Sequence, residues 1–133
     1  MARKFGKRTI EFENKPAIIG YGSVVGKKEH DGPLGREFDK FITDSFFGEK
    51  TFEKAESKLQ KTAVEIALKK ADMTPMDIDK IFAGDLLNQC IASSFGIRDS
   101  NIPFLGLFGA CSTFVESLIV GSTFIDGNFA TNT

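Results

Sequence analysis

The sequence predicts an α/β protein in which a mostly parallel sheet carries helices on both faces, in three layers. Short apolar segments near residues 17–25, 80–84 and 102–108 alternate with longer segments whose apolar residues recur at helical spacing. The apolar segments are far enough apart for helical crossovers, which parallel strands require. The composition agrees, since 41% hydrophobic and 26% charged residues over 133 positions are typical of a globular domain.

The first eight residues are predicted to be a basic tail. This short segment contains four cations, Arg3, Lys4, Lys7 and Arg8. A charged end of this kind is typically solvated, and attraction to an anionic membrane surface is the alternative. We therefore place the folded domain at residues 9–133.

Two strands are predicted at the start of this domain. Residues 9–12 alternate in polarity, which indicates an edge strand, and residues 17–25 form an apolar run, which indicates a buried strand. Gly20 and Gly22 interrupt the run, so we expect a bulge or the close approach of another backbone there.

A polar, glycine-rich connection spans residues 26–50 and ends in a group of phenylalanines, Phe38, Phe41, Phe46 and Phe47. Connections of this length inside a compact domain are usually functional or take part in oligomer contacts. The single histidine, His30, lies here; an exposed turn is the expected setting, and a role as a base or ligand is the alternative.

The middle of the chain contains two signals for the start of a helix. Thr51 is the predicted cap of a long amphipathic helix that ends near Lys70. The second signal is Thr74-Pro75-Met76-Asp77, which combines a cap, a proline and an acid in the first turn. Only a turn or two of helix fits before the strand at residues 80–84.

Two further helices are predicted, over residues 86–95 and 112–125. Apolar residues cover more than one face of the last helix, so we expect it to be sandwiched between layers. Residues 126–133 are predicted to be a loop where the alternation calls for a strand. The open sheet and the unpartnered helix indicate a domain that is incomplete at its carboxyl end or is completed by another chain.

The composition excludes several functions. The formal net charge of -1 provides no field that would hold nucleic acid. Cys90 and Cys111 form neither a disulfide framework nor a metal-ligand spacing, and we expect no metal and no cofactor. There is no apolar stretch of the ~20 residues that a spanning helix needs and no secretory signal, so a cytoplasmic location is expected.

The sharpest candidate for chemistry is Cys111, in Phe108-Gly109-Ala110-Cys111-Ser112-Thr113. The thiol is predicted at a turn from strand to helix, at the carboxyl edge of the sheet, where open α/β folds bind ligands. The free N–H groups of the helix start favour a thiolate, a ligand carboxylate or an oxyanion. Cys111 and Ser112 are therefore candidate ligand-binding residues. The alternative is that Cys111 is a small buried apolar residue, the interpretation we prefer for Cys90.

A second candidate follows the strand at residues 80–84. Asp85, Asn88 and Gln89 are predicted at the same sheet edge, where they could donate or accept hydrogen bonds with a polar ligand or a partner subunit. The alternative for Asp85 is that it caps the next helix.

Four segments together resemble the stage V sporulation protein AD family. They are Asp31-Gly32-Pro33-Leu34-Gly35, Ala83-Gly84-Asp85-Leu86-Leu87-Asn88-Gln89, Ile102-Pro103-Phe104 and the Cys111 segment. Each is weak alone, and their order and spacing are specific. The resemblance covers about residues 9–130.

The resemblance implies a thiolase-like fold in which two similar α/β halves face each other and the molecule forms a homodimer; this chain corresponds to the amino-terminal half. It implies binding of dipicolinic acid, possibly with calcium, for uptake into the developing spore. It also implies a peripheral location at the inner membrane of the forespore or spore, through partner membrane proteins. Cys111 falls on the nucleophile position of true thiolases, while the family acts as a binder and not as an enzyme.

Two other functions remain open. In the first, Cys111 transfers acyl groups as thiolases and ketoacyl synthases do, although those enzymes take their proton-handling histidine from the second half. In the second, the chain only supplies an interface through the phenylalanine-rich stretch at residues 38–47. Fold-level kinship to enzymes does not decide between them.

Overall fold

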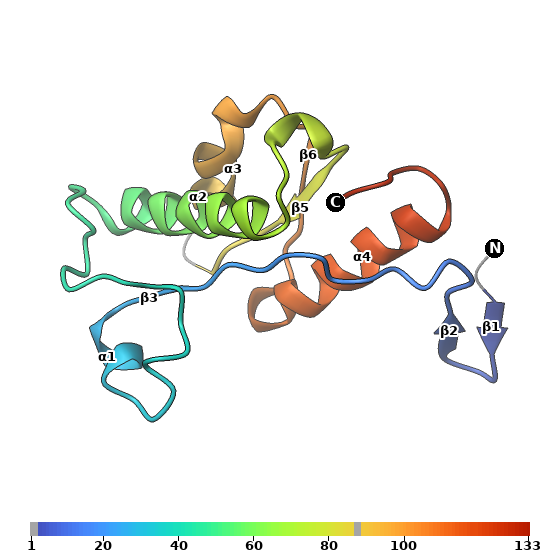
Figure 1. The fold of residues 1–133 in the computed structure, drawn as a ribbon, viewed down its shortest axis with the longest axis horizontal. Helices are drawn as coiled ribbons and strands as arrows, with labels where there is room; N and C mark the ends of the chain where they lie inside the picture. Colours follow the sequence, from blue (N-terminus) through green and yellow to red (C-terminus); the bar gives the residue numbers. More distant parts are fainter. Residues whose placement is uncertain (1–2, 87–88) are drawn as a thin grey trace.

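The computed structural model describes residues 3–86 and 89–133; the candidate residue Asn88 lies outside them. Figure 1 shows helices and short strands that alternate along most of the chain, as expected for the α/β class. In the described part of the chain the strands form three separate two-stranded sheets, and two of these sheets are parallel. The prediction of mixed α/β structure with parallel pairing is confirmed, and the prediction of one continuous sheet is wrong for the described residues.

The chain begins with an antiparallel hairpin of β1 (Arg3–Phe5) and β2 (Thr9–Glu11). Gly6 provides the left-handed backbone conformation of the turn, with a φ of 65°. The edge strand predicted near residues 9–12 is therefore confirmed. Its partner, β1, lies within residues 1–8, which are predicted to be a basic tail. This strand was not predicted, because the hydrophilic side chains of the segment give no strand signal.

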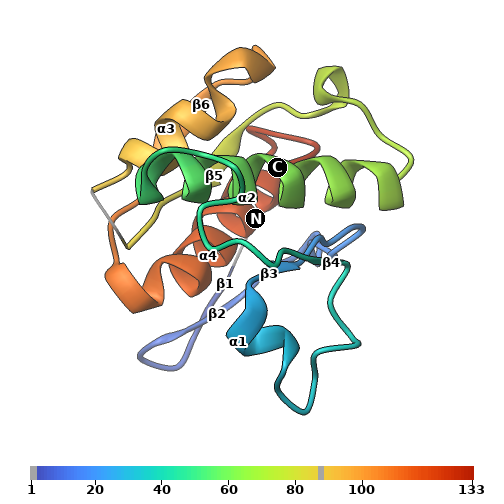
Figure 2. The same cartoon turned by 90° about the vertical axis from the view of Figure 1, so that its left-hand side faces the viewer.

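The next sheet pairs β3 (Val24–Val25) with β4 (Lys40–Phe41) in parallel, and the short helix α1 (Lys27–His30) lies between them. The prediction of a buried strand over residues 17–25 is wrong for most of its length, since Ile18 and Ile19 are 74% and 61% exposed. Figures 1 and 2 show α1 and its flanking turns extending away from the other helices.

The predicted close approach at Gly20 and Gly22 is confirmed. A Cβ atom on Gly20 would lie 2.6 Å from the carbonyl oxygen of Ala67, and one on Gly22 would lie 2.1 Å from that of Ala63. Both alanines belong to the long helix α2 (Phe52–Lys70). The segment before β3 therefore lies against this helix at a distance that only glycine permits.

Helix α2 begins and ends as the sequence predicts. The side chain of its cap, Thr51, accepts a hydrogen bond from the backbone N–H of Lys54 (3.3 Å), and the helix ends at Lys70. The second start signal produces one 3₁₀ turn, η1 (Pro75–Asp77), in which the Asp77 carboxylate accepts hydrogen bonds from the backbone N–H and hydroxyl of Thr74.

The third sheet pairs β5 (Ile81–Ala83) with β6 (Phe104–Gly106) in parallel, with Phe82 opposite Leu105. Both strands lie within the apolar segments predicted for them. Helix α3 (Ile91–Ile97) and the 3₁₀ turn η2 (Arg98–Ser100) form the crossover between the strands. The chain ends in the turn η3 (Ala110–Ser112), helix α4 (Thr113–Asp126) and a terminal loop.

The helix predicted over residues 86–95 starts later than expected. Gln89 and Cys90 have φ values of 49° and 71°, which place both in the left-handed region and prevent a right-handed helix from including them. The helical conformation therefore begins at Ile91.

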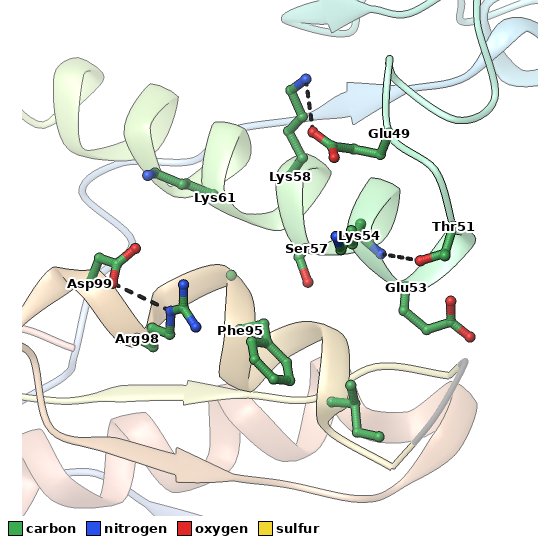
Figure 3. Close-up of a pocket in the computed structure, with 12 residues that line it drawn as sticks. Glu49, Thr51, Glu53, Lys54, Ser57, Lys58, Lys61, Phe95, Arg98 and Asp99 are labelled. Carbon is green, nitrogen blue, oxygen red and sulfur yellow. Dashed lines mark hydrogen bonds and ion pairs between the residues drawn. The ribbon is translucent and has the colours of Figure 1, made fainter.

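Helices lie on both sides of the β5–β6 pair, with α2 and α3 packed together on one side and α4 on the other (Figures 2 and 3). Helix α4 is not sandwiched in this chain, because Phe114, Val115 and Ile119 are 72%, 56% and 55% exposed. Among residues 3–86 and 89–133, no helix combines the length and the apolar character that a bilayer crossing requires.

Candidate functional site

Cys111 is the middle residue of η3, the turn that joins β6 to α4. Its side chain is a free thiol and the residue is exposed. The predicted placement of the thiol at a turn from strand to helix is therefore confirmed. The alternative of a buried apolar cysteine is wrong for Cys111, which stands on an open surface.

The turn around Cys111 is held by hydrogen bonds among its own residues. The backbone N–H of Gly109 donates to the hydroxyl of Thr113 (3.1 Å), and the hydroxyl of Ser112 donates to the carbonyl of Gly109 (2.6 Å). Ala110 has a φ of 48°, a left-handed conformation that costs a residue with a Cβ atom about 1–2 kcal/mol. The turn thus stores strain next to the thiol, as functional turns often do.

The start of α4 has no side-chain cap. Ser112 stands at the cap position, but its hydroxyl is bonded to Gly109 and makes no bond to the first turn of the helix. The backbone N–H of Thr113 donates to the carbonyl of Ala110, so an anion at this end would be held by the N–H groups that follow Thr113 and by the helix dipole. The surface beside Cys111 can therefore accept a carboxylate.

Glu116 adds a negative charge to the same turn. It is the acidic residue in the first turn of α4, and its Oε2 atom is buried without a hydrogen-bond partner among the described residues. This oxygen lies against Gly109, where a Cβ atom would come within 2.5 Å of it. Glu116 was not predicted as a site residue; its signal in the sequence is an acid five residues after the cysteine, in the first turn of the helix. A carboxylate here opposes an anionic ligand and attracts a cation.

Asp85 follows β5 and is only 4% exposed. Its Oδ2 atom accepts hydrogen bonds from the backbone N–H and the hydroxyl of Ser93, at 3.0 and 2.9 Å. Ser93 is the third residue of α3, so Asp85 satisfies an N–H of the first turn, as a cap does. The structure thus contains the hydrogen bond that the capping alternative for Asp85 requires.

Glu56, on α2, is a second acid beside Asp85 and was not predicted. Burial raises the pKa of the Glu56 carboxyl above its ordinary value, and the nearby charges of Asp85 and Glu53 raise it further. A hydrogen bond from the Leu86 backbone lowers this pKa in part. The Oε2 atom of Glu56 is buried without a hydrogen-bond partner among the described residues. In the sequence Glu56 is an ordinary polar residue of a helix, so nothing predicted its position beside Asp85.

The structure brings the segments after β5 and β6 to one sheet edge, as predicted. A Cβ atom on Gly84 would lie 2.1 Å from the carbonyl oxygen of Leu107 and 2.8 Å from Cγ2 of Thr113. The thiol of Cys90 also donates to the carbonyl of Leu107 (3.1 Å), which ties the start of α3 to the same place. Of the two described candidates after β5, Asp85 is buried and Gln89 is exposed.

A groove of about 460 Å³ opens beside this edge, between α2 and α4. Gly84, Thr113 and Phe114 line it, together with Phe82 and Gly121. Cys111 and Ser112 are not among the residues that line this groove; they precede Thr113, the first of the α4 residues that do. The structure therefore places the thiol outside this hollow.

Figure 3 shows a larger hollow of about 520 Å³ between α2 and α3 that contains none of the predicted site residues. Two of its cations are paired: Lys58 with Glu49 at 3.3 Å, and Arg98 with Asp99 at 3.4 Å. Phe95 lies on its wall, 5.5 Å from the Arg98 guanidinium. The pairing leaves this hollow with little excess charge, so its size alone does not assign it a ligand.

His30 takes a structural place that the sequence did not predict. The ring is half-buried and stacks on Phe41, with 3.8 Å between the ring centres, and its Nδ1 atom lies 3.2 Å from the carbonyl oxygen of Gly35. The expectation of an exposed turn is therefore wrong for the side chain. Within residues 3–86 and 89–133, no group of three or more acidic, histidine or cysteine side chains could hold a metal ion.

Comparison with known proteins adds two findings. The family model described as "Stage V sporulation protein AD (SpoVAD)" matches residues 6–133. A relative from Bacillus subtilis (strain 168), "Stage V sporulation protein AD", is 45% identical over 125 residues, which cover 94% of this chain and 37% of the relative. The chain thus spans a little over a third of the length of the curated relative it matches.

Proposed function

The chain belongs to the stage V sporulation protein AD family and has a role in sporulation; from its site we propose that it helps to bind dipicolinic acid for uptake into the developing spore. One observation carries the proposal: Cys111 lies exposed at the start of α4, where Ser112 provides no side-chain cap. Dipicolinic acid is a flat aromatic dicarboxylate. Its carboxylates can accept hydrogen bonds from free backbone N–H groups at the start of a helix.

In this proposal one carboxylate of the ligand accepts hydrogen bonds from the first turn of α4, and its ring covers the Cys111 thiol. The end of β5 packs directly against the start of α4, because a Cβ atom on Gly84 would lie 2.8 Å from Cγ2 of Thr113. This close packing supports the proposed geometry. Asp85 supports the neighbouring helix through Ser93 and acts as a positioning residue. Ser112, exposed beside the thiol, provides a hydroxyl at the edge of the site.

Glu116 favours the calcium complex over the free dianion. A buried carboxylate oxygen without a partner, next to Gly109, repels a second carboxylate but stabilises a divalent cation that arrives with it. The described residues offer no cluster of three metal-binding side chains, so we propose that calcium enters with the ligand and that dipicolinate supplies most of its oxygens.

The rest of the binding site is proposed to come from the part of the family's length that this chain does not cover. The exposed apolar residues Phe114, Val115 and Ile119 on α4 are the surface that a second, thiolase-like half would cover. That arrangement would create the three-layer fold and the homodimer implied by the resemblance. A peripheral location at the inner membrane of the spore, through partner membrane proteins, belongs to the same proposal.

Acyl transfer is the second candidate, and the exposure of the Cys111 thiol at a strained turn favours it. In this reaction the Cys111 sulfur would attack the thioester carbonyl of an acyl-CoA, an acyl–sulfur bond would form, the bond to the CoA sulfur would break, and the proton of the Cys111 thiol would pass to the departing CoA thiolate. Mass spectrometry after incubation with acetyl-CoA separates the two functions. An acetyl group on Cys111 that turns over would establish an enzyme, and unmodified protein supports binding alone.

Isothermal titration of dipicolinate, with and without calcium, tests the binding proposal. The titration uses this chain and the full-length Bacillus subtilis relative side by side. We expect saturable binding of dipicolinate to the relative. When this chain is joined to the rest of the family's length, we expect the substitution Cys111→Phe to abolish that binding. Thr123→Phe, an exposed position further along α4, is the matched control and should bind as the parent does.

A further inference from the structure

The amino-terminal hairpin is a strongly charged surface. Every residue from 3 to 11 is exposed, and the segment contains four Lys or Arg side chains against one Glu, a net charge of +3. The whole chain has a formal charge of -1, so the remaining residues together have a charge of -4. The protein is therefore polarised, with its positive end on one small element.

The charge is concentrated at the turn of the hairpin. Arg3 and Glu11 face each other at the end far from the turn, with 3.8 Å between their charged groups, so these two charges offset each other. The cations left over are Lys4, Lys7 and Arg8. Phe5 stands among them and is 70% exposed.

The segment just after the hairpin is anchored to the end of α4. Asn14, just after β2, donates two hydrogen bonds to Asp126 at the end of α4, one to its carboxylate (2.9 Å) and one to its carbonyl (3.0 Å). Figures 1 and 2 show the hairpin projecting from the helices, with its turn pointing outward. The turn can therefore reach a flat surface while the acidic body stays away from it.

We propose that the turn of this hairpin, from Lys4 to Arg8, is a membrane-contact site for anionic lipid headgroups. Lys4, Lys7 and Arg8 would bind lipid phosphates, and Phe5 would enter the interface between headgroups and acyl chains. A flat anionic surface suits the charge distribution better than nucleic acid does, because a long polyanion would also meet the acidic body. The inference deepens the peripheral location proposed above and is independent of the bound ligand.

Cosedimentation of the full chain with vesicles tests the site. Vesicles of phosphatidylglycerol mixed with phosphatidylcholine should bind the chain at low salt, and vesicles of phosphatidylcholine alone should not. Each interfacial cation contributes about fivefold to partitioning, so Lys7→Ser/Arg8→Ser should reduce it by about 25-fold. Lys28→Ser/Lys50→Ser, which removes two exposed cations elsewhere, is the control and should bind nearly as well as the parent.

Three results would overturn the site: equal loss in both double variants, equal binding to both kinds of vesicle, or tight binding to duplex DNA without binding to vesicles. Phe5→Ala should reduce partitioning about tenfold and leave its salt dependence unchanged. The Lys7→Ser/Arg8→Ser variant should keep the dipicolinate response of the parent, so failure at the membrane and failure of ligand binding are told apart. Circular dichroism verifies that each variant is folded.

Discussion

The carboxylate of Asp85 accepts hydrogen bonds from both the backbone N–H and the hydroxyl of Ser93, and it thereby fixes the start of α3 at the end of β5. Both residues are buried, so the bonds are shielded from water. This contact holds one side of the sheet edge on which Cys111 lies.

Asp85→Ala should destabilise the protein by about 1–3 kcal/mol, because it leaves two buried donors of Ser93 without an acceptor. Urea unfolding followed by circular dichroism measures the change. Asp85→Asn retains one acceptor oxygen and should lose less. Equal stability of Asp85→Ala and the parent would show that α3 is held by its apolar contacts alone.

Glu56→Gln should raise the free energy of unfolding at neutral pH. Burial and the charge of Asp85 raise the pKa of Glu56 in the folded protein, so its ionised form opposes folding. The unfavourable effect is absent below the ordinary pKa of 4.5 and develops as pH rises through the higher folded-state value. Urea unfolding of both proteins across this range measures it, and a gap that fails to widen with rising pH would contradict the assignment.

Gly84→Ala should cost about 2 kcal/mol or more, because a Cβ atom at this position would lie 2.1 Å from the carbonyl oxygen of Leu107. That atom is backbone and cannot move without shifting the end of β6. Gly26→Ala is the control, since a Cβ atom there meets nothing within 4 Å. Thermal unfolding compares the two, and similar melting temperatures would mean that Gly84 and the carbonyl oxygen of Leu107 are not in close contact.

Ala110→Gly should stabilise the chain by about 1 kcal/mol, since glycine adopts a φ of 48° without the strain that a Cβ atom causes. Ala71→Gly, at a residue with right-handed backbone, should destabilise it instead. If urea unfolding shows a loss of stability at position 110, the left-handed turn before Cys111 is not strained.

Local signals in the sequence predicted α2, the β5–β6 pair and the position of Cys111 correctly. The Thr51 cap, the apolar spacing of α2 and the short apolar runs of β5 and β6 are signals that lie within a few neighbouring residues. The late start of α3 was not predicted: Gln89 and Cys90 are left-handed, and the Cys90 thiol donates to the carbonyl of Leu107, 17 residues away, a contact that exists only in the folded chain. Tertiary contacts decided that boundary.

The candidate site was predicted only in part, for a similar reason. A strand followed by a small-residue turn identified Cys111, but Glu116 and Glu56 resemble ordinary helix-surface acids in sequence. Their buried oxygens arise from Gly109 and from the segment around Asp85, which come close only in the folded chain. The histidine–phenylalanine stack in the long connection is likewise a contact between residues 11 positions apart.

The central claim is that the start of α4 binds dipicolinate together with calcium, and Glu116→Gln tests it most directly. In the complete protein this substitution should tighten binding of free dipicolinate and reduce the gain that calcium provides, since it removes one negative charge beside Gly109. Calorimetric titrations with and without calcium measure both effects. Unchanged affinities in both conditions would show that the ligand binds elsewhere.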